Sequence, residues 1–191
     1  MSEKPTRADA WALLCEFTDN PSLIKHALGV EAAMRAYARH FGEDEEAWGI
    51  VGLVHDFDYQ QNPTEETHLH VGTHILRERG WPGAWVRAIA SHADYMGVPR
   101  DTLMARALFA VDELSGFLSA AALVRPDKAI AEVQVKSVKK KLKDKAFARG
   151  VNRDDVYRGA EELGVELDEH IAFVRDAMAT IADQLELPTP G

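Results

Sequence analysis

The chain has 191 residues, of which 46% are hydrophobic and 28% are charged, a balance typical of one globular domain with a sizeable core. Its formal net charge of −9 argues against general binding to nucleic acids or anionic membranes, because both favour a basic surface. The single cysteine, Cys15, excludes an intrachain disulfide and a CxxC zinc site. There is no secretory signal segment and no apolar run long enough to span a bilayer, so we expect a cytoplasmic protein.

Capping residues, proline and glycines mark helices along the first half of the chain. Asn20 followed by Pro21 is typical of a helix start, and Gly42 is a natural stop for that helix. Gly49 and Gly52 lie in the next expected helix, where they would allow close packing against a neighbour. The ranges predicted to be helical here are 21–41, 44–55, 64–79 and 81–92.

The second half is expected to be helical as well. Asp101 is a candidate cap for a long apolar helix that ends before Pro126, and Asp127 is a candidate cap for the lysine-rich helix that follows. Residues 133–138 alternate like a strand, but their flanks favour helix. The predicted ranges are 102–124, 128–144, 154–163 and 167–185, so the fold class is all-α. We expect the end of the chain, 187–191, to fray.

Side chains that bind metals recur at the ends and along the faces of these helices. Imidazole nitrogens and carboxylate oxygens together suit divalent iron, manganese, cobalt, nickel or zinc. Asp112 interrupts the apolar run "LFAVDELSGFL", a costly position unless the carboxylate is paired or bound to a metal. His40 and His170 are interpreted as ordinary surface or core residues. The candidates are His26, His55, Asp56, His68, His70, His74, His92 and Asp112.

The order of these residues resembles that of the HD superfamily of metal-dependent phosphohydrolases. His26 matches the first histidine of the family, His55-Asp56 the doublet that names it, and Asp112 the last aspartate. "HLHVGTHIL" resembles the "HPxxGAxIL" segment of two-metal members, which nominates His68, with Gly72 as the family glycine. "AIASHADY" resembles their next histidine segment and nominates His92. Nearly the whole chain resembles a group of predicted HD hydrolases of undefined substrate.

The resemblance implies a centre of two divalent metal ions. In it, Asp56 would bridge the ions, while His26, His55 and Asp112 would hold one ion and His68 and His92 the other. Such a pair deprotonates water at neutral pH and clamps a phosphate. The implied activity is hydrolysis of a phosphoester in a small phosphorylated metabolite or nucleotide by a metal-bound hydroxide.

The choice of histidine in the third helix leaves an alternative open. Helical spacing turns His70 about 200 degrees away from His68, so the two side chains cannot easily face the same centre. His70 and His74 share one face of the helix, and they are the alternative source of a ligand.

The doublet segment departs from the family pattern. Two-metal members often read "HDIGK", with a lysine that contacts the substrate phosphate, whereas this chain reads "HDFDY". Tyr59 holds the lysine position and is a candidate substrate contact. Asp58 replaces the glycine. Like Asp56, it is a candidate catalytic residue, which would orient a ligand histidine or transfer a proton. A helix or loop cap is an equal alternative for Asp58.

A basic segment stands out in this acidic chain. Its lysines recur every three or four residues and so share one helical face, which is either a solvated surface or an anion-binding surface that closes over the metal centre. In the second interpretation, these basic side chains take the role of the lysine that is missing from the doublet segment. The candidate substrate-binding residues of this kind are Arg125, Lys136, Lys139, Lys140, Lys143 and Arg149.

The expected protein is thus an HD-domain helical bundle with C-terminal helices packed on it. We divide it into an N-terminal segment (1–19), an HD metal-binding core (20–125) and a helical extension of the same domain (126–187). Its expected partner is a small phosphorylated substrate. We expect no binding to membranes and no general binding to nucleic acids. A homodimer is also expected, although no sequence motif indicates it. Two other functions stay open: a mixed-valent di-iron oxygenase, which uses the same ligand set, and a non-catalytic module that senses a ligand.

Overall fold

The computed structural model describes residues 4–188, which fold into helices joined by turns and loops, without a strand among them. The all-α fold class is therefore confirmed. The α-helices are α1 (Arg7–Phe17), α2 (Pro21–Phe41), α3 (Glu45–Val54), α4 (His70–Glu78), α5 (Gly83–Ser91), α6 (Leu103–Leu123), α7 (Val135–Leu142), α8 (Arg153–Leu163) and α9 (Leu167–Ala179), with short 3-10 helices at Asp94–Met96 and Ile130–Glu132. No helix of this described part combines the length and apolar composition needed to cross a membrane.

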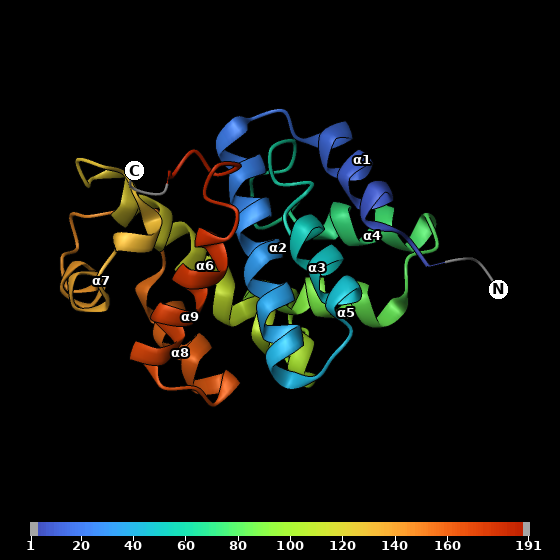
Figure 1. Ribbon diagram of the computed structural model, residues 1–191. Helices are drawn as coiled ribbons and strands as arrows, with labels where there is room; N and C mark the ends of the chain where they lie inside the picture. Colours follow the sequence, from blue (N-terminus) through green and yellow to red (C-terminus); the bar gives the residue numbers. More distant parts are fainter. Residues whose placement is uncertain (1–3, 189–191) are drawn as a thin grey trace.

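Helix α2 runs through the middle of the molecule and organises the other helices around it (Figure 1). It packs against α3 on one side and against α6 and α9 on the other. The helices α8 and α9 pack on α6, so the C-terminal part of the chain is docked on the same bundle. The loop-rich segment around α7 lies at the opposite end from the N-terminus.

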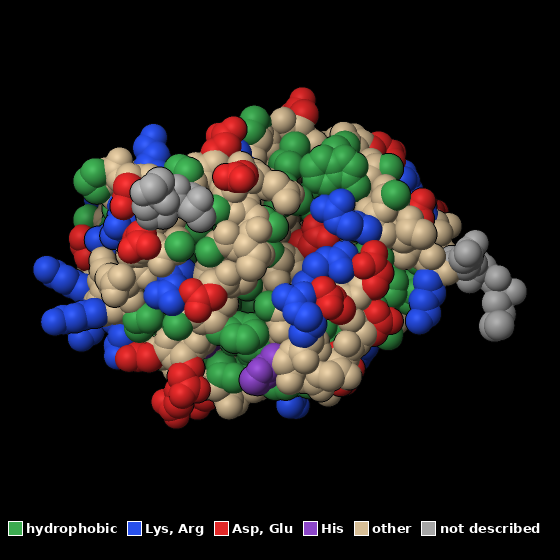
Figure 2. Space-filling view, viewed as in Figure 1, with side chains coloured by type: hydrophobic (Ala, Val, Ile, Leu, Met, Phe, Trp, Pro, Cys, Tyr) green, Lys and Arg blue, Asp and Glu red, His purple; other side chains and the backbone are tan. Residues whose placement is uncertain are grey.

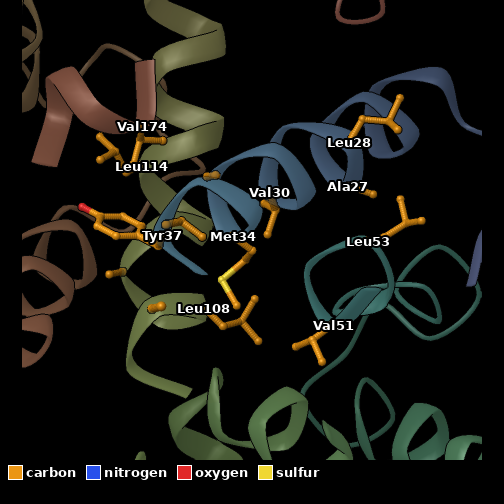
Figure 3. Close-up of a cluster of buried hydrophobic side chains, with 14 of the residues drawn as sticks. Ala27, Leu28, Val30, Met34, Tyr37, Val51, Leu53, Leu108, Leu114 and Val174 are labelled. Atoms are coloured by element: carbon orange, nitrogen blue, oxygen red, sulfur yellow. The ribbon is translucent and has the colours of Figure 1, made fainter. Parts of the chain in front are cut away.

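The core is a continuous set of apolar side chains between these helices (Figure 3). Met34 of α2 is fully buried and points toward Val51 of α3 and Leu108 of α6. Farther along the core, Leu114 of α6 lies near Val174 of α9. Burying a side chain of this size contributes roughly 1.5–3 kcal/mol, so the core holds the helices that carry the polar centre in fixed positions.

Helix boundaries in the first half follow the predicted signals closely. The Asn20 side chain accepts hydrogen bonds from the backbone N–H groups of Ser22 and Leu23, and Pro21 opens α2. Gly42 ends this helix in the left-handed conformation, with φ of 72°. A Cβ atom at Gly52 would lie 3.1 Å from the carbonyl oxygen of Val30, so glycine lets α3 approach the backbone of α2.

Three of the predicted helix ranges are wrong in part. Helix α4 begins at His70 rather than at residue 64, because residues 64–69 form turns. The helix expected over 128–144 begins only at Val135. There, Asp127 accepts the N–H of Ala129 in a local turn and Lys128 has φ of 52°, so the chain leaves the helical path. Helix α9 ends at Ala179, and turns replace the helix expected up to residue 185.

Two more differences concern local interactions. Thr102, rather than Asp101, caps α6 by accepting the Ala105 N–H, and Asp101 instead pairs with Arg87. Helix α1 was not predicted, although Thr6 and Asp9 form a capping box at its start. Of the tail expected to fray, residues 189–191 lie outside the described part, and Leu187 is buried.

His170 joins the C-terminal helices to the bundle from a fully buried position. Its Nε2–H donates to the carbonyl oxygen of Ala110 at 2.9 Å, and the hydroxyl of Tyr37 donates to Nδ1 at 2.6 Å. Both ring nitrogens are therefore satisfied in the neutral form, as expected of a core histidine. Burial lowers the pKa of His170 to about 4, which the hydrogen bond to Ala110 only partly opposes.

We predict that replacing His170 removes part of the acid sensitivity of folding. The unfolded chain protonates His170 near its ordinary pKa of about 6.5, so it binds more protons than the folded chain between that pH and about pH 4. Stability must fall as the pH falls through this window, by about 1.4 kcal/mol from this residue between about pH 7.5 and about pH 5.5. In urea unfolding of the metal-free protein, the free energy of unfolding should fall less for His170→Gln than for the unmodified chain over this pH range. The difference between the two decreases should be about 1.4 kcal/mol.

The matched control is His40→Gln, since His40 is exposed near the end of α2. This variant tests whether any exchange of histidine for glutamine has the same effect. An equal pH dependence in all three proteins would contradict the neutral, buried state of His170.

Candidate metal centre

Six side chains of metal-binding type meet in the interior, although they come from separate elements. They form two groups, and the ligand atoms of each group lie within 4.8 Å of one another. Asp56 belongs to both groups. The first group is His26, His55, Asp56 and Asp112, and the second is Asp56, His68 and His92.

The first group is built by the close packing of α2, α3 and α6. Nε2 of His26 lies 2.9 Å from Oδ1 of Asp112, and Nε2 of His55 lies 3.2 Å from the same oxygen. Nε2 of His55 is also 3.5 Å from Oδ2 of Asp56. The close approach at Gly52 explains the meeting of these histidines, because His55 follows Gly52 by one helical turn.

The second group gathers around the other oxygen of Asp56. Nε2 of His68, in the turn before α4, and Nε2 of His92, at the end of α5, each lie 3.1 Å from Oδ1 of Asp56. Asp56 thus turns one carboxylate oxygen to each group, and its side chain keeps 25% of its surface exposed. A carboxylate in this position can bridge two ions.

Backbone carbonyls fix how two of the imidazoles face the centre. His55 Nδ1–H donates to the carbonyl oxygen of Gly52 at 2.7 Å, and His92 Nδ1–H donates to that of Ile89 at 2.6 Å. Since a carbonyl can only accept, each ring carries its hydrogen on Nδ1 and turns Nε2 toward the carboxylates. This is the usual way in which proteins orient histidine ligands.

Asp58 does the same for His68 from a fully buried position. Its Oδ1 lies 3.1 Å from Nδ1 of His68, while its Oδ2 accepts the N–H groups of Leu69 and Gly72 at 2.9 and 3.0 Å. It therefore orients His68 and caps the start of α4 at the same time. A Cβ atom at Gly72 would lie 2.6 Å from Cγ of Asp58, so the glycine makes room for this carboxylate.

The backbone between His68 and α4 is strained. Leu69 has φ of 61° and ψ of −33°, and the N–H of His70 donates to the carbonyl oxygen of His68 at 2.8 Å. This geometry is a γ-turn with positive φ, which is rare for a residue with a side chain. Leu69 is fully buried, so the core holds the turn in place and turns His68, rather than His70, toward Asp56.

Buried opposite charges shift the pKa values of the centre. Burial opposes ionisation of Asp56 and Asp112, yet His55 beside both carboxylates, with hydrogen bonds from His68, His92 and His26, holds both pKa values below the usual range. Burial also opposes protonation of His55, His68 and His92, but the carboxylates outweigh it and raise all three pKa values, that of His68 to about 9. A divalent ion at the Nε2 atoms would take the place of these protons.

The donor set fits a divalent transition metal. Four imidazole nitrogens and the oxygens of two carboxylates are aimed at shared points, and the other ring nitrogens of His55, His68 and His92 already have partners. Borderline ions prefer this mixture of nitrogen and oxygen ligands. The two groups have the composition and the outer hydrogen bonds of a metal centre.

The centre opens into a pocket of about 390 Å³. Its floor includes Asp56, His68, His92 and Asp112. Aromatic rings of Tyr59, Tyr95 and Phe109 and the carboxylates of Glu65, Asp94, Glu113 and Asp155 line the rest, together with Ala93 and Asn152. Burial, reinforced by the nearby Asp112 carboxylate, raises the pKa of Glu113 to about 7.

The other candidate ligands and substrate contacts lie elsewhere. His70 and His74 belong to neither ligand group: both are exposed, and His74 lies 3.3 Å from Glu78. Tyr59 lines the pocket, whereas the basic side chains do not. Arg125 pairs with Asp127, and Arg149 is exposed on the surface.

The predicted lysine face lines a separate hollow beside α7. Lys136, Lys139, Lys140 and Lys143 border it, with Asp168 paired to Lys139 at 2.8 Å. Basic side chains project from the molecule in this region (Figure 2). The structure thus does not bring this face over the metal centre.

Sequence reasoning missed part of the pocket wall. Glu65, Phe109, Asn152 and Asp155 line it but were not singled out as candidates. Asn152 and Asp155 reach the pocket because α8 docks on α6, a packing that no local motif encodes. Glu65 lies in the turn segment that was expected to be helical, so its direction could not be inferred.

Comparison with known proteins agrees with this geometry. A family model described as HD domain matches residues 23–116, a span that includes both ligand groups. Neither a curated protein nor a solved structure matches the chain. Members of the matched family are commonly metal-dependent hydrolases. The order of the ligand residues, their convergence in an all-helical bundle and the family match lead to one conclusion: residues 23–116 of the chain form a domain of the HD superfamily.

Proposed function

We propose that the protein is a phosphohydrolase with two divalent metal ions, acting on a phosphoester of a small molecule. The observation that carries this proposal is the position of Asp56, which one ligand group shares with the other at the floor of a pocket. His26, His55 and Asp112 would complete one ion site, and His68 and His92 the other. Two-ion sites of this kind are typical of phosphate-ester hydrolysis.

The metal ions would supply Lewis-acid activation of water and would neutralise negative charge on the phosphate oxygens. The chain supplies the rigid framework. Asp56 and Asp112 provide the negative charge that holds the cations, and the partners of His55, His68 and His92 keep the imidazoles from turning away. In the overall reaction, a water oxygen bonds to phosphorus, the ester P–O bond breaks, and the leaving alcohol oxygen takes up a proton.

Asp58 is a positioning residue in this scheme rather than a catalytic one. It has no exposed surface and does not line the pocket, so it cannot touch a substrate. Tyr59 does line the pocket and is the candidate contact at this end of the doublet segment. For the whole protein, we propose a small phosphorylated substrate as partner, a homodimer as the assembly and the cytoplasm as location.

The direct test of this function is a phosphate-release screen. Full-length protein loaded separately with manganese, cobalt or iron should release inorganic phosphate from one class within a panel of small phosphoesters, and Asp56→Asn should release none. The same ligand set serves di-iron oxygenases, so oxygen uptake is measured in parallel with the iron-loaded protein. Substrate-dependent oxygen uptake without phosphate release would contradict the proposal and favour the oxygenase.

We predict that Asp56→Asn abolishes binding at both ion sites. Isothermal titration of metal-free protein with manganese or cobalt should give two equivalents per chain for the unmodified protein. Because Asp56 is shared, its loss affects both groups, whereas His68→Ala affects only the second and should leave one equivalent. Asp94→Asn is the matched control, since Asp94 lines the pocket outside both groups. Two equivalents retained by Asp56→Asn would rule out the bridge.

We predict that Asp58→Asn weakens the second ion site alone. An asparagine has one acceptor oxygen, so it cannot serve the His68 ring and both backbone N–H groups as the carboxylate does. Metal affinity at that site should fall about 10- to 100-fold, as with other residues that orient ligands.

A double variant separates positioning from loss of fold. If Asp58 acts through His68, then Asp58→Asn combined with His68→Ala should bind metal no more weakly than His68→Ala alone. Circular dichroism checks that each variant is folded. Equal losses at both ion sites, or fully additive losses, would show that Asp58 acts in another way.

A further inference from the structure

The pocket above the metal centre has a negatively charged wall. Four carboxylates, those of Glu65, Asp94, Glu113 and Asp155, line it beyond the metal-binding residues. Neither lysine nor arginine is among the described residues that line it. A pocket built for a polyanion such as a nucleoside triphosphate places cationic groups around the phosphates, and this wall does the reverse.

Arginines outside the pocket offset only part of this charge. Arg158 pairs with Asp94 at 2.9 Å and with Asp155 at 3.0 Å, and Arg100 pairs with Asp94 at 3.0 Å. These cations also share the carboxylate of Glu162. Among the residues that the structure describes, Glu65 is not paired with a cationic side chain, so the wall retains negative charge at Glu65.

Aromatic rings lie in the same pocket as these carboxylates. Tyr59 and Tyr95 are 40% and 38% exposed, unusually open positions for large aromatic side chains, and Phe109 adds a third ring to the lining. Tyr59 packs edge-on against the ligand His68, with ring centroids 5.2 Å apart, so it borders the metal centre itself. Aromatic faces next to carboxylates are the surroundings in which proteins bind ammonium groups.

We infer that the substrate is a phosphoester whose alcohol part carries a positive charge, such as an amino-alcohol or quaternary ammonium phosphate. This inference rests on the proposed phosphohydrolase function and names its substrate class. The phosphate would lie at the ions, and the ammonium group would lie against Glu65, Tyr59 and Tyr95. The pocket volume of about 390 Å³ is at the lower end for ligand sites and suits such a small molecule.

The test compares two substrates of equal shape and different charge. Phosphocholine carries the quaternary nitrogen. In 3,3-dimethylbutyl phosphate, an uncharged carbon atom takes the place of this nitrogen. In metal-loaded protein, kcat/KM should favour phosphocholine by about tenfold or more, the preference expected of a partly desolvated cation beside aromatic and acidic groups. Glu65→Gln should move this ratio toward one. Glu66→Gln, an exposed neighbour outside the pocket, should leave the ratio unchanged.

A second measurement does not depend on catalysis. Choline itself, titrated into the metal-free protein, should shift the tyrosine ring signals of Tyr59 and Tyr95 in NMR spectra, and Glu65→Gln should weaken this binding. If choline binds in this way but none of the esters is hydrolysed, the phosphohydrolase function fails while the cation site stands.

The opposite outcome overturns the inference alone. Phosphate release that is equal for phosphocholine and its uncharged isostere, or that favours a nucleoside triphosphate over both, would leave the hydrolase function in place. It would show that the acidic wall does not select a cationic substrate. An absence of any tyrosine shift with choline would count against the site in the same way.

Discussion

Two carboxylates held among four histidines inside a helical bundle are the constraint on which the rest of the structure depends. Asp56 and Asp112 lie where burial opposes their charge, and only compensating charge makes such a position tolerable. Without an ion, protonation of His68, whose pKa is raised to about 9, provides part of that compensation, and a divalent metal would provide it more completely. The same side chains therefore link folding, metal binding and the proposed chemistry, since each needs positive charge between these oxygens.

The bundle meets this constraint by bringing backbones close together at particular points. Gly52 lets α3 reach α2, which sets His55 beside His26, and Gly72 leaves space for the Asp58 carboxylate that directs His68. The strained turn at Leu69 completes the second group. The C-terminal helices add the far wall of the pocket through the docking of α8 on α6, so the region outside the matched family span shapes what can reach the candidate metal centre.

The sequence predicts local features better than features that arise from packing. The start of α2 at Asn20-Pro21 follows from capping chemistry, which needs only residues close in the chain. The ligand order, from His26 to Asp112, follows instead from a family resemblance. The late start of α7 could not be predicted from the sequence, because a local turn at Lys128 overrides the helical pattern. The acidic pocket wall could not be read either, since Asp155 reaches it only through tertiary packing. The resemblance named Gly72, but only the structure explains it, through the Asp58 carboxylate.

The central claim is that Asp56 bridges two ions, and anomalous diffraction tests it most directly. Crystals of the protein loaded with manganese or cobalt should show two anomalous peaks per chain about 3.5–4 Å apart, with one Asp56 oxygen bound to each ion. His26, His55 and Asp112 should surround one peak, and His68 and His92 the other. A single peak, or two peaks with Asp56 bound to neither or to only one, would contradict the account.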